Sequence, residues 1–201
     1  MRTLDEKLSH LRADARDNRD RILRSARTLF SERGLGVGMR EVARRAQIGP
    51  ATLYRHFPTK QQLIDEAFSA ELRSCREIVV DGAADSDPWN GFTCVIRRLT
   101  ALNVRNRGFV DAFTSAGAID GTIDVHRREL LGMLAQLARR AQASGDLRTD
   151  FRIEDLTIVL LAGRGLSTAE PTRRAAAAER FADLAIDAFR VPTRTRGSAP
   201  R

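Results

Sequence analysis

Apolar residues recur at helical spacing along almost the whole chain, and no segment shows the strict alternation expected of a half-buried strand. Near the N-terminus, Ile22, Ala26, Leu29 and Phe30 follow each other at intervals of one to four residues and line one side of a helix. The stripe ends just before Gly34, a residue that commonly terminates helices. About nine such segments follow one another without an internal repeat. The sequence therefore predicts an all-α protein of about nine helices.

The composition excludes several classes of protein. With 201 residues, of which 42% are hydrophobic, the chain is long and apolar enough to bury a core. Its longest nearly unbroken apolar run covers residues 156–163, whereas a membrane-spanning helix needs about twenty residues. Cys75 and Cys94 are too few for a disulfide framework or a zinc cluster, and we interpret both as small core residues. We expect a reduced, cytoplasmic protein without a secretory signal, a membrane span, a metal site or a cofactor.

Positive charge is concentrated at the two ends of the chain. Residues 1–60 hold 14 Lys and Arg against 7 Asp and Glu, a net charge of +7. Residues 61–189 carry −3 and residues 190–201 carry +4, which together give the formal net charge of +8. This distribution favours a polyanion partner for the N-terminal part only, although a solvated basic surface explains the charge equally well.

Residues 36–60 predict a helix-turn-helix. Residues 39–46 and 50–56 form two short helical segments that are joined by a turn over residues 47–49. Five apolar residues have the spacing to hold the two helices together: Val42, Ala43, Ile48, Leu53 and Phe57. The outward face of the second helix is then left to Pro50, Ala51, Thr52 and Arg55. Two short helices joined by a turn also occur in proteins that do not touch DNA, so the spacing alone leaves DNA binding open.

Helix start signals divide the remainder of the chain. Residues 59–62 (Thr-Lys-Gln-Gln) are typical of a capping box, which predicts one long helix from there through Ile78. Residues 81–87 are interpreted as a linker, and Asp87 followed by Pro88 predicts the next helix start. Further helices are predicted at 108–116, up to Ser144 after a break at 117–122, at 153–168 and at 171–189. The segment 153–168 is nearly apolar all round at its centre, which predicts that it is buried.

Two runs of residues carry a family resemblance. Glu-Val-Ala-Arg-Arg-Ala at 41–46 and Ala-Thr-Leu-Tyr-Arg-His-Phe-Pro-Thr-Lys at 51–60 closely resemble the signature of the TetR family of bacterial transcriptional regulators. Residues 21–34 also resemble the first helix of that family. The resemblance is specific over residues 19–68, and over residues 80–190 it extends only to a helical domain of the expected length.

The resemblance implies a set of DNA-contacting residues in and beside the motif. They are Arg40, Pro50, Ala51, Thr52, Tyr54, Arg55 and Lys60. Tyr54 and Lys60 match positions that meet phosphates, and Pro50 matches the start of the base-facing helix. Two positions depart from the family pattern. Gly38 brings no hydroxyl to cap the first helix of the motif, and Gln47 replaces a turn glycine, which predicts a non-glycine residue at positive φ.

The resemblance further implies a small, mostly apolar effector among the middle helices. The candidate lining residues are Trp89, Phe92, Ile96, Asn103, Phe109, Phe113, Met133 and Leu137. Thr93, Asn103 and Arg107 are candidate polar anchors in such a pocket. An aromatic stripe at helical spacing is more often part of an ordinary core than of a ligand pocket, so the residues themselves leave both interpretations open.

The last two helical segments resemble the pair of helices through which this family dimerises. The candidate interface residues are Leu160, Phe181, Leu184, Ala185 and Ala188. Two helices from each subunit then form a four-helix interface about a two-fold axis.

The predicted organisation is therefore an N-terminal arm (1–18), a three-helix helix-turn-helix DNA-binding domain (19–62), an effector-binding and dimerisation domain (63–190) and a basic tail (191–201). A shared helix reaching to about residue 80 joins the two domains. The arm has no net charge, and the spacing of Leu4, Leu8, Leu11 and Ala15 favours a helical extension of the first helix. We expect the arm to be disordered or to pack rather than to bind DNA. The predicted function is a homodimeric repressor that a small molecule releases from a palindromic operator. A helical scaffolding domain and an enzyme with an acidic substrate are the alternatives, and we identify no catalytic arrangement, so we expect no enzyme.

Overall fold

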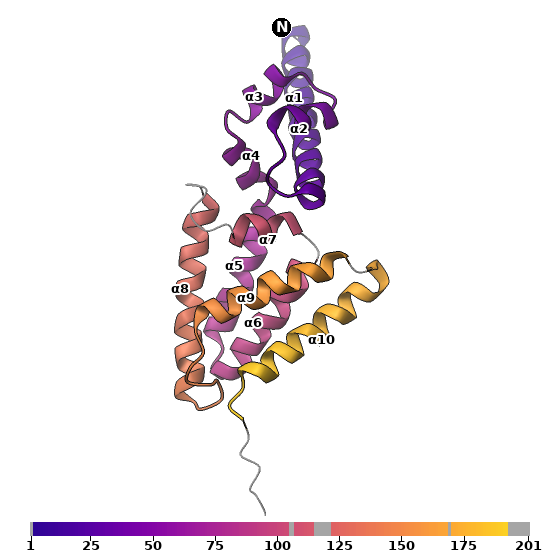
Figure 1. Cartoon of the computed structure of the whole chain (residues 1–201). Coiled ribbons are helices and arrows are strands. Elements are labelled where there is room, and N and C mark those ends of the chain that lie inside the picture. Colours follow the sequence, from indigo (N-terminus) through magenta and orange to yellow (C-terminus); the bar gives the residue numbers. More distant parts are fainter. Residues whose placement is uncertain (1, 105–106, 115–121, 169, 193–201) are drawn as a thin grey trace, which may run out of the picture. The chain divides into compact units, whose positions relative to one another are not determined.

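The computed structural model describes residues 2–104, 107–114, 122–168 and 170–192, and these residues are almost entirely helical (Figure 1). They form ten α-helices and one 3-10 helix, with a single isolated bridge between Leu147 and Arg190. The helices are α1 (Arg2–Arg33), α2 (Met39–Arg45), α3 (Pro50–His56), α4 (Lys60–Ala67), α5 (Ser69–Ala84), α6 (Pro88–Asn103), α7 (Arg107–Thr114), α8 (Thr122–Ala143), α9 (Ile153–Gly163), η1 (Arg164–Thr168) and α10 (Pro171–Phe189). The all-α prediction is confirmed. None of the described helices is long and apolar enough to cross a membrane.

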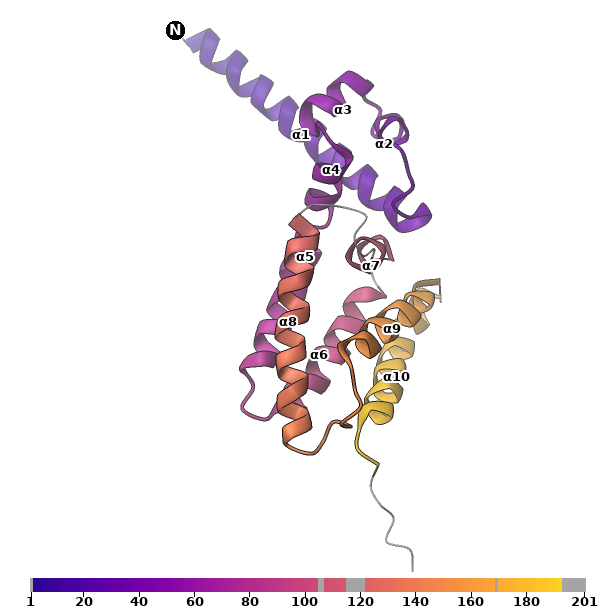
Figure 2. The same ribbon diagram turned by 60° about the vertical axis from the view of Figure 1, so that its left-hand side comes forward.

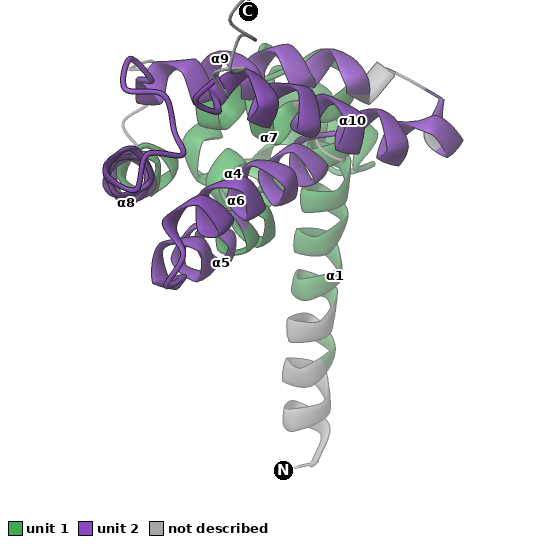
Figure 3. Ribbon diagram, turned by 90° about the horizontal axis from the view of Figure 1, so that it is seen from below, with its two compact units in different colours: residues 1–74, 106–127 green, residues 75–105, 128–201 purple. Residues whose placement is uncertain are grey.

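The chain divides into two compact units (Figure 3). The first consists of residues 1–74 and 106–127, and the second of residues 75–105 and 128–201. We describe each unit by itself.

In the first unit, α1 packs against α2, α4 and α7. Four phenylalanines connect these helices, with ring centroids 6.1 Å apart between Phe30 and Phe68, 6.1 Å between Phe68 and Phe109, and 5.6 Å between Phe109 and Phe113. A Cβ atom on Gly108 would lie 2.8 Å from the carbonyl oxygen of Phe30. Helix α7 therefore lies directly against the backbone of α1, and this close approach requires a glycine at position 108.

In the second unit, α6 packs against α9 and α10, and α8 runs beside α5 (Figures 1 and 2). The rings of Phe92, Phe151 and Phe189 meet edge to face or tilted, with centroids 4.9–6.4 Å apart. The predicted helix start at Asp87 is confirmed, because its carboxylate accepts hydrogen bonds from the backbone N–H groups of residues 89 and 90. The apolar periodicity of α6 thus corresponds to a buried face, and Phe92 on that face is fully buried.

The structure corrects several predicted helix boundaries. The single helix predicted from the capping box through Ile78 is two helices. Helix α4 ends at Ala67, and the C-cap residue Phe68 is fully buried with its ring beside those of Phe30 and Phe109. Helix α5 then continues to Ala84, so most of the predicted linker is helical. The N-terminal arm is also helical, since α1 begins at Arg2 (Figure 2). The predicted break at residues 117–121 and the tail from residue 193 lie outside the described residues.

Two predictions of burial are wrong. The side chain of Ile158 is 63% exposed and Leu161 is also exposed, although we expected α9 to be buried all round. Helix α9 packs within its unit through Leu156 and Leu160, which share one face, and the opposite apolar face is left open. Cys75 is buried as expected, but Cys94 is exposed on the outer side of α6.

Candidate nucleic-acid interface

Helices α2 and α3 form the predicted helix-turn-helix around a small apolar core. Val42 and Ala43 on α2 and Leu53 on α3 are buried, and Phe57 closes the end of α3 with no exposed surface. Arg19 on α1 lies over the Phe57 ring, with its guanidinium carbon 4.7 Å from the ring centroid. These contacts fix the rotation of α3 about its axis, so the residues between the buried positions face outward.

The turn between the two helices has the backbone that its sequence predicts. Gln47 has a φ of 54°, so a non-glycine residue occupies the left-handed region as expected. Arg21 on α1 holds this turn, because its Nη2 donates to the backbone oxygens of Ala46 at 2.6 Å and of Gln47 at 3.2 Å. Pro50 opens α3 at a position where a backbone N–H is not needed.

The candidate DNA-contacting side chains are all at least partly exposed. Arg40, Pro50, Ala51 and Arg55 are exposed, Thr52 and Lys60 are half-buried, and 47% of the Tyr54 surface is exposed. The guanidinium of Arg55 donates to the Thr52 hydroxyl at 3.1 Å, which links two candidate base-facing residues one turn apart. The structure thus brings Arg55 and Thr52 together on α3, and it leaves the other candidates on α2, α3 and the start of α4 exposed or half-buried.

The starts of α2 and α4 differ in their caps. Thr59 accepts a hydrogen bond from the backbone N–H of Gln62 at 3.1 Å, which is the cap that the sequence predicts. Lys60 is the first residue of α4, and burial lowers the pKa of its amine. At the start of α2, Gly38 provides no side-chain cap, as expected. Thr59 thus satisfies a backbone N–H at the start of α4, and the half-buried Lys60 is the first residue of that helix.

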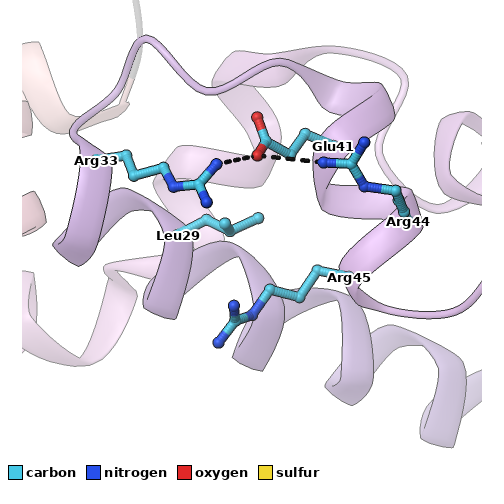
Figure 4. A pocket seen from close by; sticks show the side chains of 5 residues that line it. All are labelled: Leu29, Arg33, Glu41, Arg44 and Arg45. Atoms are coloured by element: carbon cyan, nitrogen blue, oxygen red, sulfur yellow. Dashed lines mark hydrogen bonds and ion pairs between the residues drawn. The ribbon is translucent and has the colours of Figure 1, made fainter.

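A pocket of about 230 Å³ lies between the end of α1 and α2 and was not anticipated from the sequence (Figure 4). Leu29 lies beneath it, and Arg33 and Arg44 both donate to the Glu41 carboxylate, the latter at 3.5 Å. Arg45 completes the lining. Because Glu41 on α2 accepts a hydrogen bond from Arg33 on α1, this cluster connects the first helix of the motif to α1.

The candidate dimer-interface residues differ in exposure. Leu184 is 51% exposed and Ala188 is exposed, Phe181 is half-buried, and Leu160 and Ala185 are buried within the unit. The exposed apolar residues Ile158 and Leu161 of α9 were missing from the sequence-based set.

The candidate effector residues do not all belong to one unit. Trp89, Phe92, Ile96 and Asn103 on α6 lie in the second unit with Met133 and Leu137 on α8, and the remaining two lie on α7 in the first unit. The two α7 residues are Phe109 and Phe113. The side chain of Arg107, a candidate anchor, lies outside the described residues. Thr93 is buried, but its hydroxyl already donates to the backbone oxygen of Asn90 at 3.1 Å.

An all-α chain that contains a helix-turn-helix and a second helical unit is typical of DNA-binding transcriptional regulators. Residues 22–67 match the family model described as bacterial regulatory proteins, tetR family. Residues 87–191 match the model described as transcriptional regulator SbtR-like, C-terminal domain. The chain belongs to the TetR family of transcriptional regulators, and it carries that family's DNA-binding domain.

Known proteins similar to this chain support the assignment. The HTH-type transcriptional regulator SAUSA300_2515 of Staphylococcus aureus is 44% identical over 54 residues, which are 26% of this chain and 29% of that protein. The match thus spans less than a third of the length of that curated relative. The TetR transcriptional regulator SCO0520 of Streptomyces coelicolor is 32% identical with a TM-score of 0.51, covering 87% of this chain and 99% of the other. AibR, solved with isovaleryl coenzyme A and operator DNA, shares the fold at 20% identity and a TM-score of 0.63, covering 88% and 100%.

Proposed function

We propose that this chain is a homodimeric repressor that a small molecule releases from a palindromic operator. The observation that supports it most is the division of α3 into two sides. Leu53 is buried against α2, while Pro50, Ala51 and Arg55 stand exposed at the other side. A helix of this kind presents its first turns to base edges in the major groove.

Within this proposal, Tyr54 and Lys60 contact phosphates and position the protein, whereas Arg40 and Arg55 read bases. An arginine that donates both its amino groups to guanine contributes about 1–3 kcal/mol of discrimination. Thr52 and Ala51 offer methyl groups that suit the methyl of thymine. Phosphate contacts carry no sequence information, so the two classes of residue are separable by experiment.

Dimerisation is supported by the exposed apolar residues of the last two helices. Ile158 and Leu161 on α9 lie one turn apart, and Leu184 and Ala188 on α10 also lie one turn apart. Contiguous apolar surface of this kind marks interaction sites in soluble proteins. A two-fold axis through a four-helix interface would place two recognition helices about 34–36 Å apart, in successive turns of the major groove.

The proposed release from DNA by an effector is explained by thermodynamic linkage between effector binding and DNA binding. A ligand that prefers the conformation whose recognition helices are wrongly spaced lowers DNA affinity, usually by about 5–150-fold. The fold neighbour AibR was solved with both a coenzyme A thioester and operator DNA, so one protein of this fold binds both kinds of partner.

DNA binding is tested by titrating the protein against random-sequence duplex DNA in gel shifts at rising salt. Binding should weaken steeply with salt, and a scaffolding protein or an enzyme with a small acidic substrate would leave the duplex unshifted. Once an operator is in hand, Arg55→Ala should lose preference at one symmetric pair of base positions in a panel of single-base changes. The control Arg139→Ala, an exposed arginine on α8, should change neither affinity nor preference. A uniform loss across the panel would make Arg55 a phosphate contact.

The dimer is tested by Leu184→Asp in light scattering and gel shifts. A carboxylate buried at the interface without a partner costs several kcal/mol, so the variant should lose dimerisation and DNA affinity together. Val125→Asp is the matched control, because Val125 is an exposed apolar residue on α8 rather than on α9 or α10. A Leu184→Asp variant that stays dimeric and binds DNA normally would exclude this face as the interface.

A further inference from the structure

All the buried polar side chains of the described residues lie on one helix, α6. They are Thr93, Thr100 and Asn103, and no charged side chain in the described part of the chain is buried to the same degree. Thr93 and Thr100 are seven residues apart, so they lie on the same side of α6 two turns apart, and Asn103 follows one turn later. Within the second unit this side of α6 therefore carries three buried polar side chains among buried apolar ones such as Ile96.

The two threonines differ in how their hydroxyls are satisfied. Thr93 donates to the backbone oxygen of Asn90, as most buried hydroxyls in helices do. Thr100 is only 2% exposed, and its Oγ1 has no hydrogen-bond partner. Buried side-chain oxygens are almost always hydrogen-bonded in native proteins, so an unpartnered one requires an explanation.

The helices that pack against α6 in the second unit bury apolar side chains. Helix α6 packs against α9 and α10, whose buried residues are apolar: Leu156, Leu160, Ala178, Ala182, Ala185, Ile186 and Phe189. A hydroxyl in such surroundings loses its bonds to water without replacement, which disfavours the ligand-free protein. A ligand that supplies the missing hydrogen bond would recover that loss.

We propose that Thr100, with Asn103 one turn further along α6, is the polar anchor of the effector. This inference rests on the proposed function and specifies the chemistry of its ligand. The effector is a neutral, mostly apolar molecule with one hydrogen-bonding group, a hydroxyl or a carbonyl, that pairs with the Thr100 hydroxyl. A carboxylate or an amine would lose its hydration on entering an apolar core, which is more costly than the same loss for a neutral group. Thr93, which the sequence suggested as an anchor, already donates its hydroxyl proton to the backbone oxygen of Asn90.

The first test needs no ligand. Thr100→Val replaces the unpartnered hydroxyl with a methyl group of similar shape, and it should raise the melting temperature by about 2–4 °C. Thr93→Val is the matched control, because it removes a hydroxyl that is hydrogen-bonded, and it should not raise the melting temperature. If Thr100→Val lowers the melting temperature as Thr93→Val does, the Thr100 hydroxyl has a partner and the proposal is overturned.

The second test uses three probes of similar shape in calorimetry: 4-methylphenol, para-xylene and 4-methylbenzoate. The wild-type protein should bind 4-methylphenol at least about fivefold more tightly than para-xylene, and 4-methylbenzoate most weakly. Thr100→Val should abolish the preference for the phenol, and Thr93→Val should keep it. Equal binding of the phenol and the xylene, or a preference that survives Thr100→Val, would refute the anchor, as would tight binding of the benzoate.

A gel shift with duplex DNA keeps this inference distinguishable from the proposed function. If the phenol preference depends on Thr100 but the protein never binds DNA, the anchor stands and the regulator role fails. If the protein binds DNA but shows no dependence on Thr100, the regulator role stands and the anchor fails.

Discussion

Removing the charge of Lys60 should change the salt dependence of DNA binding, whereas removing the hydroxyl of Tyr54 should not. Lys60 is the first residue of α4, and its helix end is already capped by Thr59. One phosphate contact per subunit gives two per dimer, and each contact contributes about 0.9 to the slope of log K against log salt. Lys60→Ala should therefore flatten the slope by nearly 2. Between 50 and 200 mM salt, that difference changes the affinity ratio of wild type to variant by about tenfold.

The assay is fluorescence anisotropy on a labelled duplex over a salt series, with both variants and a Lys60→Arg control. Tyr54→Phe removes a neutral hydrogen bond, so it should lower affinity with the wild-type slope, and Lys60→Arg should keep the slope. Burial lowers the pKa of Lys60, and only the protonated amine attracts a phosphate. Wild-type affinity should thus begin to fall at a pH below the usual lysine pKa, and that fall should be absent in Lys60→Ala. Parallel salt slopes for wild type and Lys60→Ala would refute the phosphate contact.

Three further expectations follow from the packing of the second unit. Burial raises the pKa of Cys75 to about 12, so a thiol reagent at neutral pH should label exposed Cys94 alone in the native protein, counted by mass spectrometry. Gly91→Ala should destabilise the protein by about 1–3 kcal/mol in urea unfolding, because the new Cβ would lie 2.3 Å from a backbone oxygen of α5. The control Gly132→Ala should be neutral or stabilising, because its new Cβ meets nothing within 4 Å. The backbone N–H of Arg152 donates to the Asp155 carboxylate and lowers its pKa. Asp155→Asn should therefore destabilise the protein at neutral pH. The difference in unfolding free energy between wild type and variant should vanish as the pH falls through that lowered pKa.

The helix-turn-helix is the part of the structure that the sequence predicts in most detail. Its signals are local: Pro50 at a helix start, Thr59 as a cap and Gln47 in place of a turn glycine all act within a few residues. Two buried residues, Leu53 and Phe57, then determine which side of α3 faces outward. The candidate DNA-contacting surface was therefore predictable without any knowledge of the rest of the fold.

The remaining features depend on contacts between distant residues. Phe68 has the spacing of a helix interior, so its apolar pattern did not predict the helix end at Ala67, where its ring packs beside Phe30 and Phe109. An apolar helix such as α9 does not reveal which side its own chain covers, so the exposure of Ile158 was missed. Thr100 likewise looks like any helical threonine until its neighbours and its unpartnered hydroxyl are known.

Selection of bound sequences from a pool of random duplex DNA tests the central claim most directly. A homodimer that reads DNA through two copies of α3 should enrich an inverted repeat whose half-site centres lie one helical turn apart, about 10–10.5 base pairs. Arg55→Ala should select the same repeat with one symmetric pair of positions relaxed. A pool that yields no enriched sequence, or an enriched site without inverted symmetry, would contradict the proposal that this protein is a dimeric, operator-binding repressor.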